Sequence, residues 1–333
     1  MALRTVEQYK QSLRDGREVY YHGKRVDDVT THPVIRVAVN HAAIDYELAE
    51  DPETRDVVTY VDPADGERYS ALFKLPQNPQ DLLNRLAVIE AATAQGRTLV
   101  TLVKEIGNDC LFALKMVSRE MDAKLGTNYA ARVDAMYRRC RDNDLAMAVA
   151  QTDVKGDRAG GPLQQSHPDY YVRIVEERPD GIVVRGAKVH TSVAPNVNEV
   201  FVIPTRQLGE ADKDYAVAFA IPVNTPGLKL VCSSYGPPRP NAFDHPISAQ
   251  HKMMETITIF DDVFVPNDRI FMKGEWQFAG PLARTFVEFH RYTAISYKMP
   301  LVDLLVGAAH LVAEYNGIER ASHVRDKLTW LIT

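Results

Sequence analysis

Apolar residues recur every three to four positions in the second quarter of the chain, which is the spacing of one helix face. The first such run follows Asn78 and Pro79, a pair typical of a helix start, and consists of Leu82, Leu83, Leu86, Ile89 and Ala92. The same spacing predicts helices at 5–14, 34–48, 99–124 and 130–141. Turn residues predict hairpins around 19–21 and 60–69. We therefore predict a mainly helical domain over residues 1–150.

After residue 158 the hydrophobic pattern changes to the alternation of β-strands. We predict strands at 170–175, 182–184, 199–203, 215–221, 228–231 and 255–260. A proline-rich loop is predicted at 234–250, and we expect the chain to leave the sheet over 262–270. Strands at this spacing without helices between them favour an antiparallel β-barrel or sandwich over residues 151–278, and they argue against a Rossmann fold.

Helical spacing returns at 280–298 and again from Pro300 to the end of the chain. Residues 279–333 are therefore predicted to be the first part of a C-terminal helical bundle. The sequence ends inside this pattern, so we expect the bundle to be truncated. The fold class predicted from the whole pattern is α+β, in the order helices, sheet, helices.

Composition narrows the functional classes. The net charge of −5 offers no basic field for nucleic acid or for an anionic membrane surface. No apolar run approaches the roughly 20 residues of a membrane span. Three cysteines without C-x-x-C spacing argue against a cysteine-rich metal site and for a reducing compartment. We expect a cytoplasmic protein that binds neither nucleic acid nor membrane.

One polar loop stands out as candidate chemistry. Residues 151–162, Q-T-D-V-K-G-D-R-A-G-G-P, combine three glycines with two cations, Lys155 and Arg158. Glycine lets the backbone approach a ligand, and these cations suit phosphate. The segment matches neither a Walker nor a Rossmann motif. A phosphate-bearing cofactor and a merely solvated connection both remain open.

Several long motifs in the same order resemble one family. They read N-D-L-A-M-A-V-A-Q-T-D-V-K-G-D-R, D-G-I-V-V-R-G-A-K-V-H-T-S and F-D-D-V-F-V-P-N-D-R-I-F. The chain resembles the 4-hydroxyphenylacetate 3-hydroxylase family, which also contains 4-hydroxybutyryl-CoA dehydratase. The resemblance implies an acyl-CoA dehydrogenase-like architecture, a dimer or tetramer, and FAD held between the β domain and the helical bundles.

The resemblance also assigns two flavin-contacting segments. The first comprises Gln151, Thr152, Asp153, Lys155, Gly156, Asp157 and Arg158, and the second comprises His190, Thr191 and Ser192. Backbone amides and hydroxyls of these segments can bond the edge of the flavin ring. For His190 the alternative is an ordinary strand-end histidine bonded to a backbone carbonyl.

The dehydratase branch of the family carries an iron–sulfur cluster on three cysteines and one histidine. The histidine matches His290, but the cysteine positions match Thr101, Glu105 and Tyr297, so no cluster is expected. Two further residues of that branch, Glu255 and Lys298, are kept. Glu255, His290 and Lys298 are thus the candidate catalytic residues. A structural salt bridge for Glu255 and a satisfied core histidine for His290 are the alternatives.

The monooxygenase branch needs no metal, because a separate flavin reductase supplies reduced FAD that reacts with oxygen. Positions that grip the phenol in that branch match Ile106, Cys110 and Val149, which predicts a more apolar pocket. We predict an FADH2-dependent monooxygenase acting on an aromatic substrate. A cluster-free lyase or isomerase on an acyl-CoA and a non-catalytic flavin-binding protein are the alternatives.

Overall fold

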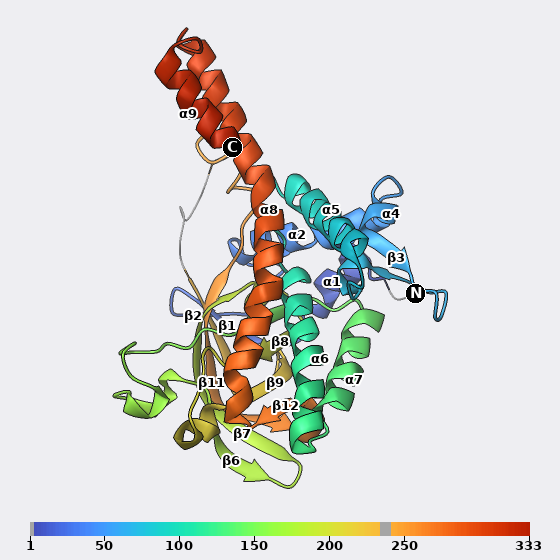
Figure 1. Ribbon diagram of the computed structural model, residues 1–333, viewed down its shortest axis with the longest axis vertical. Helices are drawn as coiled ribbons and strands as arrows, with labels where there is room; N and C mark the ends of the chain where they lie inside the picture. Colours follow the sequence, from blue (N-terminus) through green and yellow to red (C-terminus); the bar gives the residue numbers. More distant parts are fainter. Residues whose placement is uncertain (1–2, 234–240) are drawn as a thin grey trace.

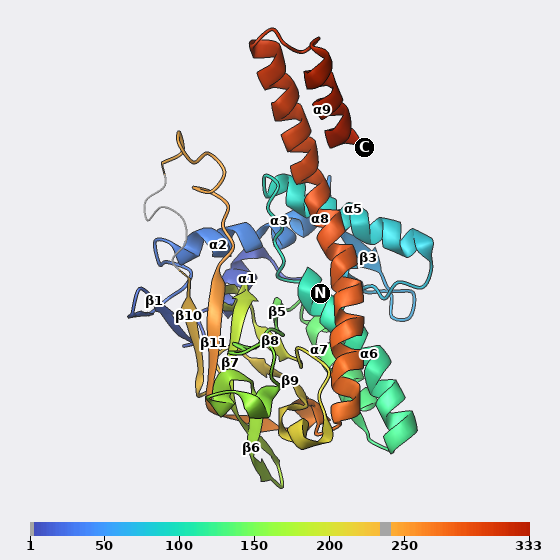
Figure 2. The ribbon, with the colours of Figure 1, turned by 60° about the vertical axis from the view of Figure 1, so that its left-hand side comes forward.

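The computed structural model describes residues 3–233 and 241–333 and shows a sandwich of two sheets flanked by helices, with a separate two-stranded sheet formed by 59–61 and 68–70 (Figures 1 and 2). The helices are α1 Val6–Ser12, α2 Ile35–Ala42, α3 Ile44–Glu50, α4 Arg55–Val58, α5 Pro79–Gln95, α6 Glu105–Leu125, α7 Tyr129–Asp142, α8 Ala279–Tyr315 and α9 Ser322–Ile332. The strands are β1 Glu18–Tyr21, β2 Lys24–Val26, β3 Thr59–Val61, β4 Arg68–Ser70, β5 Met147–Ala150, β6 Arg173–Arg178, β7 Gly181–Ser192, β8 Glu199–Val202, β9 Val217–Pro222, β10 Leu228–Cys232, β11 Glu255–Pro266 and β12 Ile270–Lys273.

The central strands form a sandwich of two open sheets. One sheet has the order β2-β1-β10-β11-β7-β6 and the other has the order β12-β9-β8-β5. Phe219 of the second sheet meets Phe260 of the first edge to face, with ring centroids 5.9 Å apart. The sandwich alternative is thereby confirmed. The described strands close no barrel, and the sheets are mixed, since β1 pairs with β10 and β5 with β8 in parallel.

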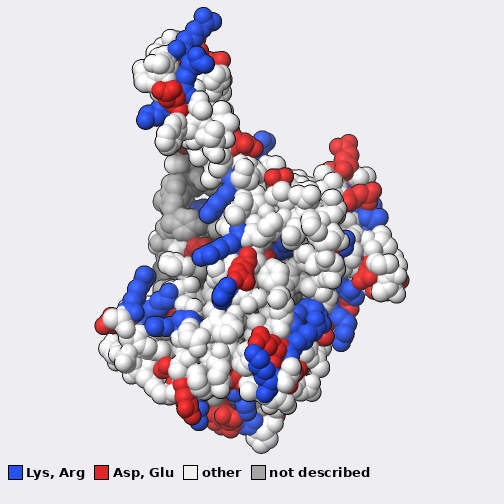
Figure 3. Space-filling view, in the orientation of Figure 1, with Lys and Arg blue, Asp and Glu red and all other residues white. Residues whose placement is uncertain are grey.

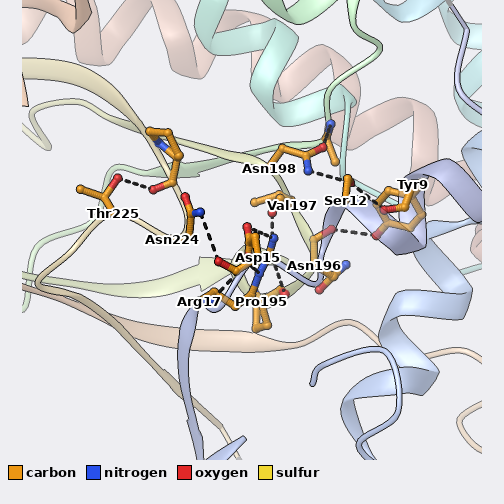
Figure 4. A network of polar contacts seen from close by, with 12 residues as sticks. Tyr9, Ser12, Asp15, Arg17, Pro195, Asn196, Val197, Asn198, Asn224 and Thr225 are labelled. Atoms are coloured by element: carbon orange, nitrogen blue, oxygen red, sulfur yellow. Dashed lines mark hydrogen bonds and ion pairs between the residues drawn. The ribbon is translucent and has the colours of Figure 1, made fainter. Parts of the chain in front are cut away.

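Hydrogen bonds join the N-terminal residues to the connection between β7 and β8, as Figure 4 shows. The buried Arg17 guanidinium donates to the carbonyl oxygens of Pro195 and Val197, at 2.9 and 2.8 Å, and pairs with Asp15. The Tyr9 hydroxyl donates to the Asn196 carbonyl at 2.7 Å. These bonds hold α1 and the β1–β2 hairpin against the sandwich, so residues 1–150 contribute strands as well as helices.

Helix α8 runs without interruption through Pro300, although two helices were predicted there. Its first half packs against α5 and α6, and its second half extends away from the sandwich towards α9 (Figure 1). The distal half exposes large apolar side chains, including Leu304, Leu305, Leu311 and Val312. In the described part of the chain, the stretch Trp276–Tyr315 alone is long and apolar enough to cross a membrane, which is weak support for such a role. On the face shown in Figure 3, cationic and anionic side chains are interspersed.

Other predicted boundaries were wrong for identifiable reasons. Helix α6 begins at Glu105 instead of 99, because 99–104 is a buried non-helical connection in which Leu102 has a φ of 63°. Strand β5 was missed because all four residues are buried, which removes the alternating pattern. Strand β11 continues to Pro266 past an irregularity between Phe260 and Val263, where we had expected an exit. Residues 234–240 of the predicted proline-rich loop lie outside the described residues.

A histidine pair ties α2 to the segment before β11. His41 is buried, its Nε2 lies 2.9 Å from the Val100 carbonyl oxygen, and its Nδ1 lies 3.2 Å from Nδ1 of His251. The carbonyl requires a proton on Nε2 of His41, so Nδ1 of a neutral His41 accepts from His251. Burial lowers the pKa of His41 to about 4.

This buried histidine makes stability pH-dependent. The folded pKa lies below the ordinary value of 6.5, so the unfolded chain binds more protons between pH 4 and 6.5. The contribution is complete above pH 6.5 and is lost as the pH falls towards 4. Between pH 7 and 4.5 we expect the wild type to lose about 2–3 kcal/mol more than His41→Gln, which cannot ionise. Urea unfolding at both pH values measures this, and equal losses in the two proteins would contradict it.

Candidate active site

The centre of the candidate site is a bulge in β7. Thr191 pairs with Thr256 and Val189 pairs with Ile257 on β11, so His190 is an extra residue without a partner across the ladder. Its φ is 55°, a left-handed value that is strained for a non-glycine residue, and its side chain is exposed. Bulges of this kind redirect a side chain and concentrate beside functional sites.

The structure brings the two predicted flavin segments together at this bulge. The Val189 amide donates to the Thr152 carbonyl at 2.9 Å, and Asp153 forms an isolated bridge with Lys188. The buried Lys188 ammonium also donates to the Gln151 carbonyl at 2.7 Å. The side chains of Gln151 and Thr152 are half-buried and make no hydrogen bond with any described residue, so both are free to meet a ligand.

Asp153 positions this loop, and most of its hydrogen-bonding capacity is taken by groups of the protein itself. Its carboxylate pairs with Lys188 at 2.7 Å, accepts from the Val172 amide at 3.2 Å and bonds the Thr205 hydroxyl. Burial lowers the pKa of Lys188, and the Asp153 charge opposes that shift. Lys188 was not a candidate from the sequence, because it lies far along the chain from the Asp153 that it pairs with.

The remainder of the loop presents two cations. Lys155 has a φ of 76° and is half-buried, while Arg158 is exposed, and neither forms an ion pair with a described residue. The side-chain amide of Gln165 closes the loop by accepting from the Asp157 amide at 2.8 Å and donating to the Gly161 carbonyl at 3.0 Å. The loop is therefore shaped by its own contacts, with both cations available to phosphate.

Glu255 faces the end of the bulged strand. Its Oε1 accepts from the Ser192 hydroxyl at 2.8 Å, while its Oε2 and the Thr191 hydroxyl are buried without a hydrogen-bond partner among the described residues. Burial raises the pKa of Glu255, and the Ser192 bond and His190 partly offset that rise. Buried polar atoms are rarely left unpaired, so these two atoms are available to pair with a bound ligand or with water.

The other catalytic candidates lie on α8. His290 Nδ1 lies 3.1 Å from Asp109 Oδ2, and its ring stacks on Phe286. Asp109 is 1% exposed and also binds Arg85 at 2.8 Å and the Thr293 hydroxyl at 2.9 Å. Asp109 and Arg85 are functional candidates that the sequence did not reveal. Lys298 is exposed and pairs with no described residue, so His290, Glu255 and Lys298 have separate surroundings.

Two of the positions that the resemblance assigns to cluster cysteines, Thr101 and Glu105, take part with Asp45 in a buried hydrogen-bonded group. Thr101 Oγ1 lies 2.7 Å from Asp45 and 2.9 Å from Glu105. One hydroxyl has a single proton, so one of these carboxyls must be protonated to make both bonds. Burial, followed by the Glu105 charge, raises the pKa of Asp45 accordingly. Over residues 3–233 and 241–333, no three His, Cys, Asp or Glu side chains are grouped to hold a metal.

Family comparison identifies the class of protein to which this sandwich and site belong. The model for the 4-hydroxyphenylacetate 3-hydroxylase N-terminal region matches residues 5–272, and the model for the C-terminal region of the same enzymes matches residues 279–333. The chain belongs to the 4-hydroxyphenylacetate 3-hydroxylase family.

Individual relatives fall in both branches. The chain is 38% identical to 4-hydroxybutyryl-CoA dehydratase/vinylacetyl-CoA-Δ-isomerase of Clostridium aminobutyricum over 98% of this chain and 67% of that protein. It is 32% identical to the oxygenase component of 4-hydroxyphenylacetate 3-monooxygenase from Thermus thermophilus, over 99% of this chain and 67% of that protein. The chain thus spans about two thirds of the length of these relatives.

Solved structures agree with this placement. An oxygenase component of 4-hydroxyphenylacetate 3-monooxygenase, complexed with FAD and 4-hydroxyphenylacetate, superposes with a TM-score of 0.89 at 32% identity, covering 99% of this chain and 68% of that one. The archaeal 4-hydroxybutyryl-CoA dehydratase from N. maritimus gives 0.88 at 29% identity, covering 99% and 66%. The fold is therefore shared by both branches and does not choose between their reactions.

Proposed function

We propose that this chain is the oxygenase component of an FADH2-dependent monooxygenase that hydroxylates an aromatic substrate. This proposal is supported by the match of nearly the whole chain to oxygenase components, one of which was solved with FAD and a phenol. A separate flavin reductase would supply the reduced cofactor. We further propose a cytoplasmic homo-oligomer, with units at 1–150, 151–278 and 279–333.

The residues around the bulge fit a flavin. The orphaned Thr191 hydroxyl, the side chains of Gln151 and Thr152 and the redirected His190 would meet the ring, and Lys155 and Arg158 would meet the phosphates. Reduced FAD supplies the electrons that activate oxygen. Asp153, Gly156 and Asp157 shape the loop, and Ser192 holds Glu255 beside the ring.

The protein's own chemistry would be proton transfer. Glu255, whose pKa is raised by burial, is suited to accept the phenol proton and so to enrich the ring in electrons. Because Asp109 accepts a hydrogen bond from Nδ1 of His290, the Nε2 atom of His290 is left as a second site for proton transfer beside Glu255. Lys298 is kept as a further catalytic candidate on the strength of its match to the dehydratase branch.

A second candidate is a redox-neutral lyase or isomerase acting on an acyl-CoA. The 38% identity to the dehydratase/isomerase favours it. Thr101, Glu105 and Tyr297 at the positions of the cluster cysteines argue against the dehydration step, which uses the cluster in that branch, and Thr101 and Glu105 are instead hydrogen-bonded to each other. A double-bond shift in vinylacetyl-CoA, followed by chromatography of the acyl-CoA products, tests this candidate.

The test of the main proposal is an anaerobic titration with reduced FAD followed by oxygen and a panel of phenols. Hydroxylated product formed in proportion to the reduced FAD consumed is the expected result. Tight binding with release of hydrogen peroxide alone, for every phenol, would overturn the monooxygenase assignment. Absence of binding would overturn the assignment of a flavin site to this chain.

Replacing Arg158 with Ala should weaken FAD binding by about tenfold, because a charge-assisted bond to phosphate is lost. Fluorescence titration with FAD measures the change. Arg36→Ala, which removes an exposed arginine on α2, is the matched control and should bind FAD as the wild type does. Equal affinities of the two variants would remove Arg158 from the site.

A further inference from the structure

A pocket of about 550 Å³ lies between the α5–α6 connection, the segment before β11 and the middle of α8. An adjoining pocket of about 710 Å³ shares Thr98, Pro246 and Ile247 with it. In Figure 2 the segment preceding β11 rises past α2, away from the sandwich. Apolar walls are supplied by Leu99, Ile247, Met253 and Leu301.

Lys252 is a cation in this pocket that pairs with none of the residues described by the structure. The residue is 9% exposed, and it makes no hydrogen bond or ion pair with any described residue. Burial alone lowers its pKa, and no carboxylate acts against that shift. Asp244, which also lines the pocket, accepts from Asn241 at 2.7 Å instead. A buried cation without a counter-ion is costly, so an anionic ligand would relieve that cost.

His251 adds a directed acceptor beside this cation. Its Nδ1 proton is committed to His41, which leaves Nε2 as an acceptor on the neutral ring. Burial, and then the charge of Arg97, lowers the pKa of His251 and so favours that neutral form. The other charged or titratable groups lining the two pockets are Asp244, His245, Lys252 and Asp303.

The α5–α6 connection is strained where it lines the pockets. Arg97 and Thr98 have φ values of 53° and 77°, and a Cβ on Gly96 would overlap the Leu99 carbonyl oxygen. Left-handed backbone of this kind is strained for a non-glycine residue, and such strain concentrates at ligand clamps. The Arg97 guanidinium lies close enough to His251 for its charge to act on that ring.

We propose that this pocket binds a phosphomonoester carried on an apolar body. A singly protonated phosphate group has an acidic hydroxyl to donate to Nε2 of His251 and anionic oxygens for Lys252 and Arg97. A carboxylate or a sulfate ester has no such proton. The apolar walls receive the rest of the ligand. This site is separate from the flavin loop and does not depend on the function proposed above.

Calorimetric titration with phenyl phosphate tests this site, with phenyl sulfate as the matched anion that has no acidic proton. Phenyl phosphate should bind the wild type, and Lys252→Met should weaken it by about tenfold or more. Lys213→Met, at an exposed lysine of the β8–β9 connection, should leave binding unchanged. Calorimetric titration in two buffers of different ionisation enthalpy should show that a proton is taken up when phenyl phosphate binds near neutral pH.

Two results would overturn the proposal. One is equal affinity of the wild type and Lys252→Met for phenyl phosphate, and the other is equal affinity of the wild type for phenyl sulfate and phenyl phosphate. Coenzyme A carries a 3′-phosphomonoester, which its 3′-dephospho form lacks. Tighter binding of coenzyme A than of the dephospho form would identify a nucleotide as the source of the phosphomonoester, and equal binding would favour a small aryl phosphate. Displacement of phenyl phosphate by FAD would assign the pocket to the cofactor and end the claim of a separate site. Failure of FAD to bind, with phenyl phosphate binding intact, would reject only the flavin site.

Discussion

Glu255→Gln should lower the hydroxylation rate by about 10²- to 10⁴-fold, the usual contribution of a positioned general base. Glutamine has the shape of glutamate and can still accept from Ser192, but it cannot take a proton from a substrate. The affinity for FAD should stay unchanged, because Glu255 offers the cofactor no charge-assisted bond. Product formation at saturating reduced FAD, together with an FAD titration, separates the two effects.

Glu67→Gln is the control, since Glu67 is exposed on the β3–β4 turn. Because burial raises the pKa of Glu255, the rate in the wild type should fall on acidification at a higher pH than an ordinary glutamate would give. A rate for Glu255→Gln within about threefold of the wild type would assign this carboxyl a purely structural role.

Asp109→Ala should destabilise the protein by about 3–5 kcal/mol, because it leaves the buried Arg85 without a counter-ion. The same change removes the acceptor for His290 and for the Thr293 hydroxyl, so α6 loses two bonds to α8 as well as its ion pair with Arg85 on α5. Urea unfolding followed by circular dichroism measures the loss.

The double variant Arg85→Met, Asp109→Leu separates loss of the ion pair from exposure of a lone charge. It removes both charges and fills the space with apolar side chains, so it should be more stable than Asp109→Ala. If the double variant is less stable than the single one, the pair itself contributes the stability and the unpaired-charge explanation is wrong.

Local patterns predicted much of the fold. Asn78 caps α5 by accepting from the Asp81 amide at 3.0 Å, as expected from the Asn-Pro pair. The hairpin at Pro179-Asp180-Gly181 joins β6 and β7 as its turn residues indicated. The predictions failed where complete burial removed the alternating pattern, as in β5. They also failed where the side-chain pattern carries no information on the backbone conformation, as at Leu102 before α6.

Part of the site was also readable from the sequence. The loop 151–158, the H-T-S segment and His290 were located by their residues and motif order, and the structure lays the first two side by side at the bulge. The pairings that give them their properties join residues distant along the chain. Asp153 with Lys188, Ser192 with Glu255, and Asp109 with His290 are examples.

The sequence by itself determined the α+β order, the family and the residues available for chemistry, because these follow from local period, turn chemistry and motif identity. Only the tertiary structure decided which carboxylates are already paired within the protein and which keep an oxygen for a ligand. Among the residues that the structure describes, it commits Asp153 to Lys188, leaves one oxygen of Glu255 unbonded and buries Lys252 without a partner. Hydrogen bonding and desolvation depend on neighbours in space, and those neighbours exist only once the sheets and helices have packed.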